Sequence, residues 1–270
     1  MHLNRLLLPL LACLPLVAQE KAKEPEGISD NSFLIEEAYN QEKGVVQHIS
    51  TWQRFHGVGN WMATFTQEWP MGSQTHQFSF TAPYLHIPGT PNGLGDVALN
   101  YRYQVVGGDP KELSFSPRLS LLLPTGDEKK GRGTGALGLQ LNLPLSVPVS
   151  DHLVTHWNAG ATHIPKAKNE LGNKADLAGI NVGASVIWNL HPEFDLMLEW
   201  VHTAQDVVAG PGLKVREKAT YLNPGLRWAH NFDSGLQIVP GIAYTYGVGS
   251  SRGDNAIFLY LSFEHPFGKR

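Results

Sequence analysis

Seven charged residues fall on the polar faces of segments in which apolar and small polar side chains otherwise alternate. Both signs are present in the set: Asp96, Arg102, Arg118, Asp195, Glu199, Arg227 and Glu264. Inside a closed sheet, such side chains would either form a charged constriction that selects solutes or pair with one another. We favour structural pairing, because burial requires charges of both signs to find partners. Glu199 and Arg227 lie on sequential segments and are expected to pair across the sheet.

A histidine and a serine stand two residues apart, at His48 and Ser50, and therefore share one face of a strand. A His-x-Ser pair is used by a twelve-stranded outer-membrane phospholipase, for which Asn60 or Asn158 would supply the third member here. No companion motif follows the pair, and spacing alone does not meet the geometric requirements of a catalytic triad. We therefore expect no enzymatic activity, and a phospholipase-like hydrolase is the least favoured alternative.

Cofactor and metal chemistry find no support in the remaining motifs. Residues 133–138 match Gly-x-Gly-x-x-Gly, but no strand-to-helix unit surrounds them, so they predict no nucleotide site. The twelve histidines are scattered, and His152 and His156 are the closest pair on one strand. The single cysteine, Cys13, lies in the N-terminal apolar run. We expect no cofactor and no metal, and the net charge of −3 argues against a nucleic-acid partner.

The elements that carry these residues have a period of two. Residues 137–147 alternate without exception, and only a β-strand places alternate residues on opposite faces in this way. The same reading along the chain predicts twelve strands, at residues 44–52, 59–69, 74–85, 95–106, 112–123, 135–148, 152–163, 176–190, 193–204, 217–230, 235–246 and 255–267. Most of them reach the roughly 9–11 residues that a tilted strand needs to cross a bilayer.

The distribution of charge and of aromatic residues separates a membrane barrel from a soluble sandwich. Lysines lie in loops, in the leader or at strand margins, and the polar strand faces carry small residues that suit a confined lumen. Short and long connections alternate, as in outer-membrane barrels. Aromatic residues at strand ends predict two girdles, one formed by Trp69, Trp188, Phe194, Trp228 and Phe267 and the other by Trp52, Trp61, Tyr84 and Tyr246. Since hydrocarbon offers no partner to an open edge, the sheet must close.

The N-terminus has the layout of a secretory signal peptide. Arg5 precedes a short apolar run that ends near Ala18, and this run is too short to span a membrane. We expect a signal peptide at 1–18, a periplasmic leader or plug at 19–43 and a barrel at 44–267. The leader holds one short helical possibility, over 34–41, which would restrict conduction if it entered the lumen.

Several stretches resemble one known family of outer-membrane transporters. They are the Glu-Glu-Ala-Tyr-Asn-Gln-Glu run within residues 35–48, then 93–97, 115–120, 123–127 and the terminal 263–267. The family is named for the meta-pathway of phenol degradation. The resemblance covers most of the predicted mature chain and implies an outer-membrane β-barrel that passes small or aromatic compounds.

The sequence thus predicts an all-β protein, an up-and-down antiparallel barrel of about twelve strands in the bacterial outer membrane. Its expected function is a passive channel or transporter for small solutes, of which aromatic or hydrophobic compounds are the class that the family resemblance implies. The alternative is a non-conducting structural barrel. The expected partners are outer-membrane lipid, the solute and the barrel assembly machinery.

Overall fold

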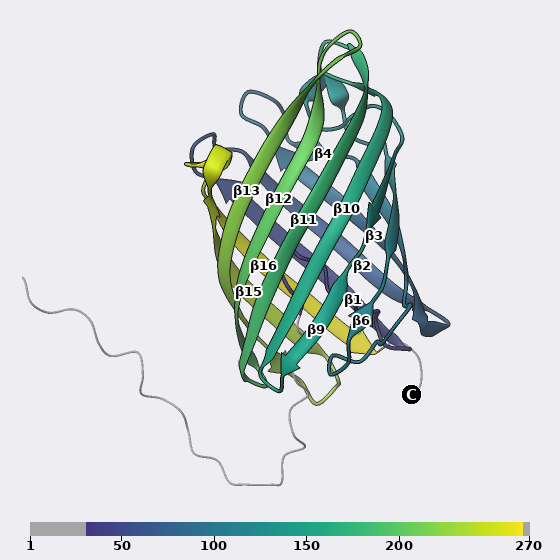
Figure 1. Cartoon of the computed structure of the whole chain (residues 1–270), viewed down its shortest axis with the longest axis vertical. Coiled ribbons are helices and arrows are strands. Elements are labelled where there is room, and N and C mark those ends of the chain that lie inside the picture. The colour runs from purple at the N-terminus through teal and green to yellow at the C-terminus, as the bar shows by residue number, and fades with distance from the viewer. Residues whose placement is uncertain (1–30, 267–270) are drawn as a thin grey trace, which may run out of the picture.

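The computed structural model describes residues 31–266 and forms a closed antiparallel barrel (Figure 1). The predicted signal peptide at 1–18 and the first part of the leader lie outside these residues. The first seven strands are β1 (Val45–Phe55), β2 (Trp61–Met71), β3 (Ser73–His86), β4 (Gly93–Leu94), β5 (Val97–Tyr103), β6 (Ser114–Phe115) and β7 (Arg118–Leu123). The next five are β8 (Gly138–Asn142), β9 (Leu145–Ser150), β10 (Leu153–Lys168), β11 (Lys174–His191) and β12 (Phe194–Gly210). The last four are β13 (Leu213–Trp228), β14 (His230–Asn231), β15 (Gln237–Gly247) and β16 (Ala256–Pro266).

Twelve strands surround the lumen, because β6, β9 and β14 continue their neighbours in the chain and β4 is a short addition to β3. The barrel closes where β1 pairs antiparallel with β16, in an unbroken register from Val45 opposite Pro266 to Phe55 opposite Ala256. Each of the other strands pairs with the next one along the chain. The predicted all-β barrel and its strand count are therefore confirmed.

Two predicted strands are each divided in two. The segment predicted at 112–123 separates into β6 and β7 around Pro117, and the segment at 135–148 separates into β8 and β9 at Pro144. Proline has no N–H to donate to the ladder, so each of these residues interrupts the pairing. The wall nevertheless continues, because β10 pairs with β8 above the break and with β9 below it.

The two faces of the wall are inverted relative to a soluble protein. Outward positions on β8, β10 and β12 hold exposed apolar side chains such as Leu139, Trp157 and Leu198. Inward positions hold buried polar residues such as Asn142 and Asn223. A soluble protein buries the first kind and exposes the second, so this outer surface is suited to lipid and the interior to polar groups. Among residues 31–266, no helix is long and apolar enough to cross a membrane.

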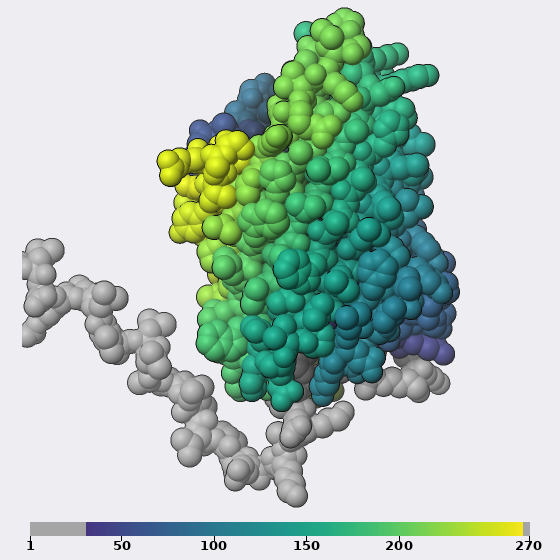
Figure 2. Space-filling model, viewed as in Figure 1, coloured from purple at the N-terminus to yellow at the C-terminus, as the bar shows by residue number. Residues whose placement is uncertain are grey.

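The wall is taller on one side than on the other. The strands β10 to β13 are 16–18 residues long, whereas β5 and β7 have seven and six. In Figure 2 the hairpin between β12 and β13 rises highest, above the C-terminal strands drawn in yellow. Near its tip, Asp206 binds Lys214 at 2.8 Å and Arg216 at 2.6 Å. Charges of this kind belong above the hydrocarbon layer, which indicates that the tall hairpin projects from the membrane.

The expected helical turn at 34–41 is wrong, because residues 31–43 have no helix and lie against the inner wall of the barrel. We call these residues the lumen segment. Backbone N–H groups that a helix would bond internally are bonded here by wall side chains. Hydrogen bonds to the wall thus take the place of the hydrogen bonds that a helix would form within itself.

Candidate functional site

The lumen segment runs round the inside of the barrel. Phe33 packs beside β16, Glu36 contacts β10, Ala38 contacts β9, and Gln41 reaches β3 and β1. From residue 33 to residue 41, the segment therefore contacts the strands in the reverse of their order in the chain, from β16 to β1, before the chain itself enters β1. This path places the segment across the interior, between the upper lumen and the mouth at which β1 begins and β16 ends.

Wall side chains bind the backbone of the lumen segment at short range. Seven of its N–H groups donate to wall side chains over 2.6–3.0 Å. The N–H groups of residues 33, 34 and 35 all donate to Glu199 Oε1. The other four donate one each: Glu36 to Asn158 Oδ1, Ala38 to Ser146 Oγ, Asn40 to Gln104 Oε1 and Gln41 to Gln77 Oε1. These inward acceptors come from five separate strand regions. The interior of the wall is thus complementary to the extended backbone of this segment.

Glu199 makes the densest of these contacts. Its side chain is fully buried, and Oε1 accepts three successive N–H groups while Oε2 accepts from Asn223 Nδ2 at 2.7 Å. Hydrogen bonds to a carboxylate are stronger than those between neutral groups. A buried carboxylate is therefore satisfied here by amide donors in place of a cation.

The expected pairing of Glu199 with Arg227 is wrong. In the β12–β13 register Asp195 lies opposite Arg227, and Glu199 lies opposite Asn223. The Arg227 guanidinium lies 2.8 Å from the Asp195 carboxylate, and both side chains are buried. A pair of Glu199 and Arg227 would centre the turn between the two strands on about residue 213, whereas the observed register centres it on about residue 211. The partner of Arg227 therefore lies four residues earlier on β12 than predicted.

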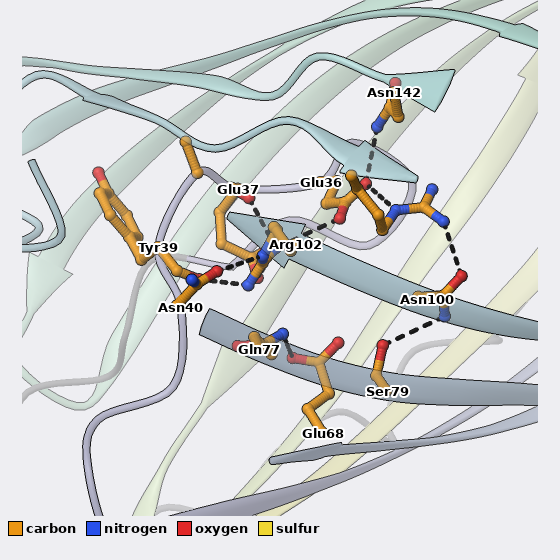
Figure 3. A network of polar contacts seen from close by, with 12 residues as sticks. Glu36, Glu37, Tyr39, Asn40, Glu68, Gln77, Ser79, Asn100, Arg102 and Asn142 are labelled. Carbon is orange, nitrogen blue, oxygen red and sulfur yellow. Dashed lines mark hydrogen bonds and ion pairs between the residues drawn. The ribbon is translucent and has the colours of Figure 1, made fainter. Parts of the chain in front are cut away.

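Two arginines, Arg102 on β5 and Arg118 on β7, join the lumen segment to the wall. Figure 3 shows Arg102 among its partners Glu37, Tyr39 and Asn40. Arg102 is 2% exposed and donates to Asn40 Oδ1 at 2.8 Å, to the Glu37 carbonyl at 3.0 Å and to the Tyr39 carbonyl. Its NH1 atom also lies 3.3 Å from Glu36 Oε1. The guanidinium therefore binds oxygen atoms of four positions of the lumen segment, at residues 36, 37, 39 and 40.

Arg118 binds the same segment from the next strand. Its Nε donates to Glu36 Oε2 at 2.8 Å, and its NH1 group donates to Asn100 Oδ1 at 2.9 Å. Asn142 adds a further donor to Glu36, at 2.7 Å. Burial raises the pKa of Glu36, but the charges of Arg118 and Arg102 outweigh it, and the net pKa is lowered. Glu36 is therefore held as a carboxylate.

Glu37 has the opposite electrostatic environment. Burial, partly opposed by Arg102 and reinforced by Glu68 and Glu36, raises the pKa of Glu37 from 4.5 to about 7. Glu68 lies on β2 and accepts from Gln77 Nε2 at 2.8 Å. The structure thus gathers three carboxyl groups around two arginines.

The remaining charged candidates lie elsewhere. Glu264 accepts from Gln47 Nε2 near the β1–β16 seam, where Gln47 also accepts from Gln41 Nε2 at 2.7 Å. Asp96 lies in the loop before β5, where it accepts from Gly126 N at 3.0 Å and from Thr134 N at 2.8 Å. Asp96 therefore organises an outer loop, while Glu264 faces the opposite mouth.

Sequence reasoning missed Glu36, Glu37 and Glu68 as lumen residues. The inward position of Glu68 could have been predicted, because Glu68 lies on the same face of its strand as Thr64 and Thr66, at a spacing of two residues. The two leader carboxylates carried no such signal, since their place inside the barrel depends on wall residues far along the chain.

Two cavities lie on either side of the lumen segment. The outer one, of about 400 Å³, is lined by segment residues, by threonines of β1–β3, by the rings of β16 and by the charged side chains of Glu68, Arg102 and Arg118. The other, of about 390 Å³, opens at the mouth beside Tyr39, Gln237 and Pro266. Asn31 and Glu37 border both cavities. These two residues therefore stand at the partition between the outer and the inner space.

His48 and Ser50 lie on the outward face of β1. The His48 ring packs against that of His265, with a distance of 3.3 Å between the two Nε2 atoms. In residues 31–266, no cluster of three or more His, Cys, Asp or Glu side chains is arranged to hold a metal ion. The polar chemistry of the described chain is concentrated in the lumen.

Comparisons with known proteins agree with this architecture. A family model described as "Putative MetA-pathway of phenol degradation" matches residues 26–250. No curated protein sequence matches the chain. The COG4313 outer membrane channel from Pseudomonas putida F1 is 11% identical with a TM-score of 0.64, covering 85% of this chain and 98% of its own. The NanC porin is 10% identical with a TM-score of 0.55, covering 82% of this chain and 100% of its own.

Proposed function

Because this chain belongs to the family described by the MetA pathway of phenol degradation, we propose that it is a bacterial outer-membrane channel for small solutes. The observation that carries the proposal is a polar lumen with a cavity on each side of a single crossing segment. Apolar residues cover the outside of the same wall, as a lipid environment requires. Solved relatives of this fold include an outer membrane channel and a porin.

The proposal includes a closed resting state. The lumen segment lies between the two cavities and is bound to the wall by its backbone and by Arg102 and Arg118. A solute would cross when this segment shifts, so residues 31–43 act as a plug that belongs to the same chain. Export through a signal peptide at 1–18 and insertion by the barrel assembly machinery complete the proposal.

The solute class follows from the outer cavity. Its wall combines hydroxyl and amide side chains, such as Thr51, Thr64 and Gln53, with the rings of Phe258 and Tyr260. Such a lining suits small compounds with an apolar body and a polar group. Aromatic compounds fit this description and agree with the pathway that describes the family.

Conductance across planar lipid bilayers tests the proposal. We expect little current through the folded mature chain and a larger current through a variant that lacks residues 19–43. Heat-modifiable mobility on gels is the control for a closed barrel in both samples. Absence of current and of solute flux from both folded proteins would instead support the structural barrel, and equal current from both would refute the plug.

Hydrolysis gains no support from the geometry. His48 makes its side-chain contact with His265, and its neighbour Ser50 points toward the lipid side of β1. A nucleophile needs a base within hydrogen-bond reach and an oriented third group. The contact of His48 with His265 supplies neither to Ser50.

A further inference from the structure

One side chain of the lumen segment fills a ring-sized recess in the wall. The Phe33 ring centroid lies 5.5 Å from that of Phe258 and 5.1 Å from that of Tyr260, with interplanar angles of 30° and 37°. These separations are within the range at which aromatic rings attract one another. Phe33 is thus held by ring contacts on the β16 side.

Two glycines provide the space for this ring. A Cβ atom added to Gly241 would lie 2.5 Å from Phe33 Cζ, and one added to Gly225 would lie 2.8 Å from Phe33 Cε2. Both distances are too short for carbon atoms in contact. The recess therefore exists because β13 and β15 carry no side chain at these two inward positions. We call it the ring recess, formed by Gly225, Gly241, Phe258 and Tyr260.

The ring recess is uncharged and opens to the outer cavity. Phe33 is only partly buried and lines this cavity together with Phe258 and Tyr260. Arg227 borders the recess, with its Cβ atom 3.2 Å from a Cβ added to Gly241, and its charge is balanced by Asp195 at 2.8 Å. The arginines that line the outer cavity, Arg102 and Arg118, are paired with Glu36. An ionised ligand in the recess would lose its hydration without gaining a partner, so the recess favours a neutral ring.

We propose that the ring recess is a binding site for a neutral monocyclic aromatic compound, and that Phe33 occupies it as an internal competitor. The inference rests on the proposed channel function, for which it specifies a neutral, single-ring compound and the place where it binds. Since Phe33 is tethered, its effective concentration at the recess is high, and a free compound competes poorly in the resting chain. A compound that takes the recess thereby displaces one anchor of the lumen segment.

Removal of the competitor gives the first arm of the test. The full mature chain and its Phe33→Ala variant are titrated with 4-fluorobenzyl alcohol, and binding is followed by fluorine NMR. A vacated apolar recess of this kind binds small aromatic compounds. We expect saturable binding to the variant, with an affinity at least about tenfold higher than that of the parent chain, because the tethered ring no longer competes.

Refilling of the recess gives the matched control. In the Phe33→Ala/Gly241→Val double variant, the added side chain points into the vacated space, and valine is well suited to a strand. We expect this variant to lose the saturable binding while it keeps heat-modifiable mobility. Equal binding by the single and double variants would place the probe in the micelle or elsewhere and overturn the proposal.

Two further outcomes are decisive. If Phe33→Ala does not fold, Phe33→Leu leaves an apolar side chain that fills less of the recess, and we expect intermediate affinity. A folded variant that binds no better than the parent chain refutes the ring recess. This readout does not depend on conduction, so binding without current would refute the channel alone, and current without binding would refute the recess alone.

Discussion

Replacement of Glu199 by glutamine should release the start of the lumen segment from the wall. The carboxylate accepts three N–H groups through one oxygen and the Asn223 amide through the other. In Glu199→Gln the first oxygen becomes neutral, and an NH2 group confronts the Asn223 donor. Hydrogen bonds to charged acceptors exceed neutral ones by about 1 kcal/mol each, so three bonds lose about 3 kcal/mol.

A loss of this size changes the balance between the docked and the released segment by roughly 150-fold. The assay is the rate at which a maleimide labels a cysteine introduced as Ser32→Cys, since Ser32 is buried against Ser185 in the docked state. The predicted mature chain contains no other cysteine, because Cys13 precedes residue 19. Labelling should be about a hundredfold faster in the Glu199→Gln background.

Asp195→Asn supplies the matched control. Asp195 lies on the same strand and face as Glu199 but binds Arg227. Its replacement should lower the stability of the wall, since it leaves a buried guanidinium without its counter-charge, and should leave the labelling rate nearly unchanged. Equal labelling of Ser32→Cys in the parent and Glu199→Gln barrels, with both heat-modifiable, would show that Glu199 does not hold the segment.

Three other changes separate the contributions of the network. Labelling of the same cysteine should speed up about tenfold or more between about pH 5 and about pH 8. Docking raises the pKa of Glu37 from 4.5 to about 7, so the docked segment holds a proton that the released segment loses. Docking therefore becomes less favourable as the pH rises above about 4.5. Rates are referred to an exposed cysteine at Val58, and Glu37→Gln should flatten the profile. Arg102→Met should release the segment by at least about a hundredfold in the same assay, since it leaves buried oxygens and carboxylates without a donor; an unchanged rate would contradict this. Asp96→Ala should leave labelling unchanged yet speed tryptic cleavage at Lys129 about tenfold, because the outer loop loses acceptors for its N–H groups; cleavage at the parent rate would rule this out.

Strand positions were predictable from the sequence because membrane and lumen enforce strict alternation. The run from Leu137 to Val147 shows this, although its division at Pro144 depends on one missing N–H group. The partner of Arg227 was harder to predict from the sequence, since the register of two strands depends on where the turn between them lies and not on the composition of a face.

The lumen segment was the least predictable part. Its local pattern over Leu34 to Gln41 is compatible with a helical turn, and nothing nearby in the chain opposes that conformation. The acceptors that decide the outcome, such as Glu199 and Asn158, lie more than a hundred residues away. Tertiary contacts of this range override local propensity and leave no trace in a short window.

The reverse order in which the lumen segment meets the wall constrains how the protein assembles. Glu199 reaches Ile35 across 164 residues of chain, and the seam contact between Gln47 and Glu264 spans 217. Loops of this length close slowly. The segment obtains its complete set of wall contacts, which include Phe258 and Tyr260 of β16, only after the last strand is in place. A newly inserted barrel would therefore pass through a hollow, water-filled intermediate, and the segment would then settle in a late and slower kinetic phase.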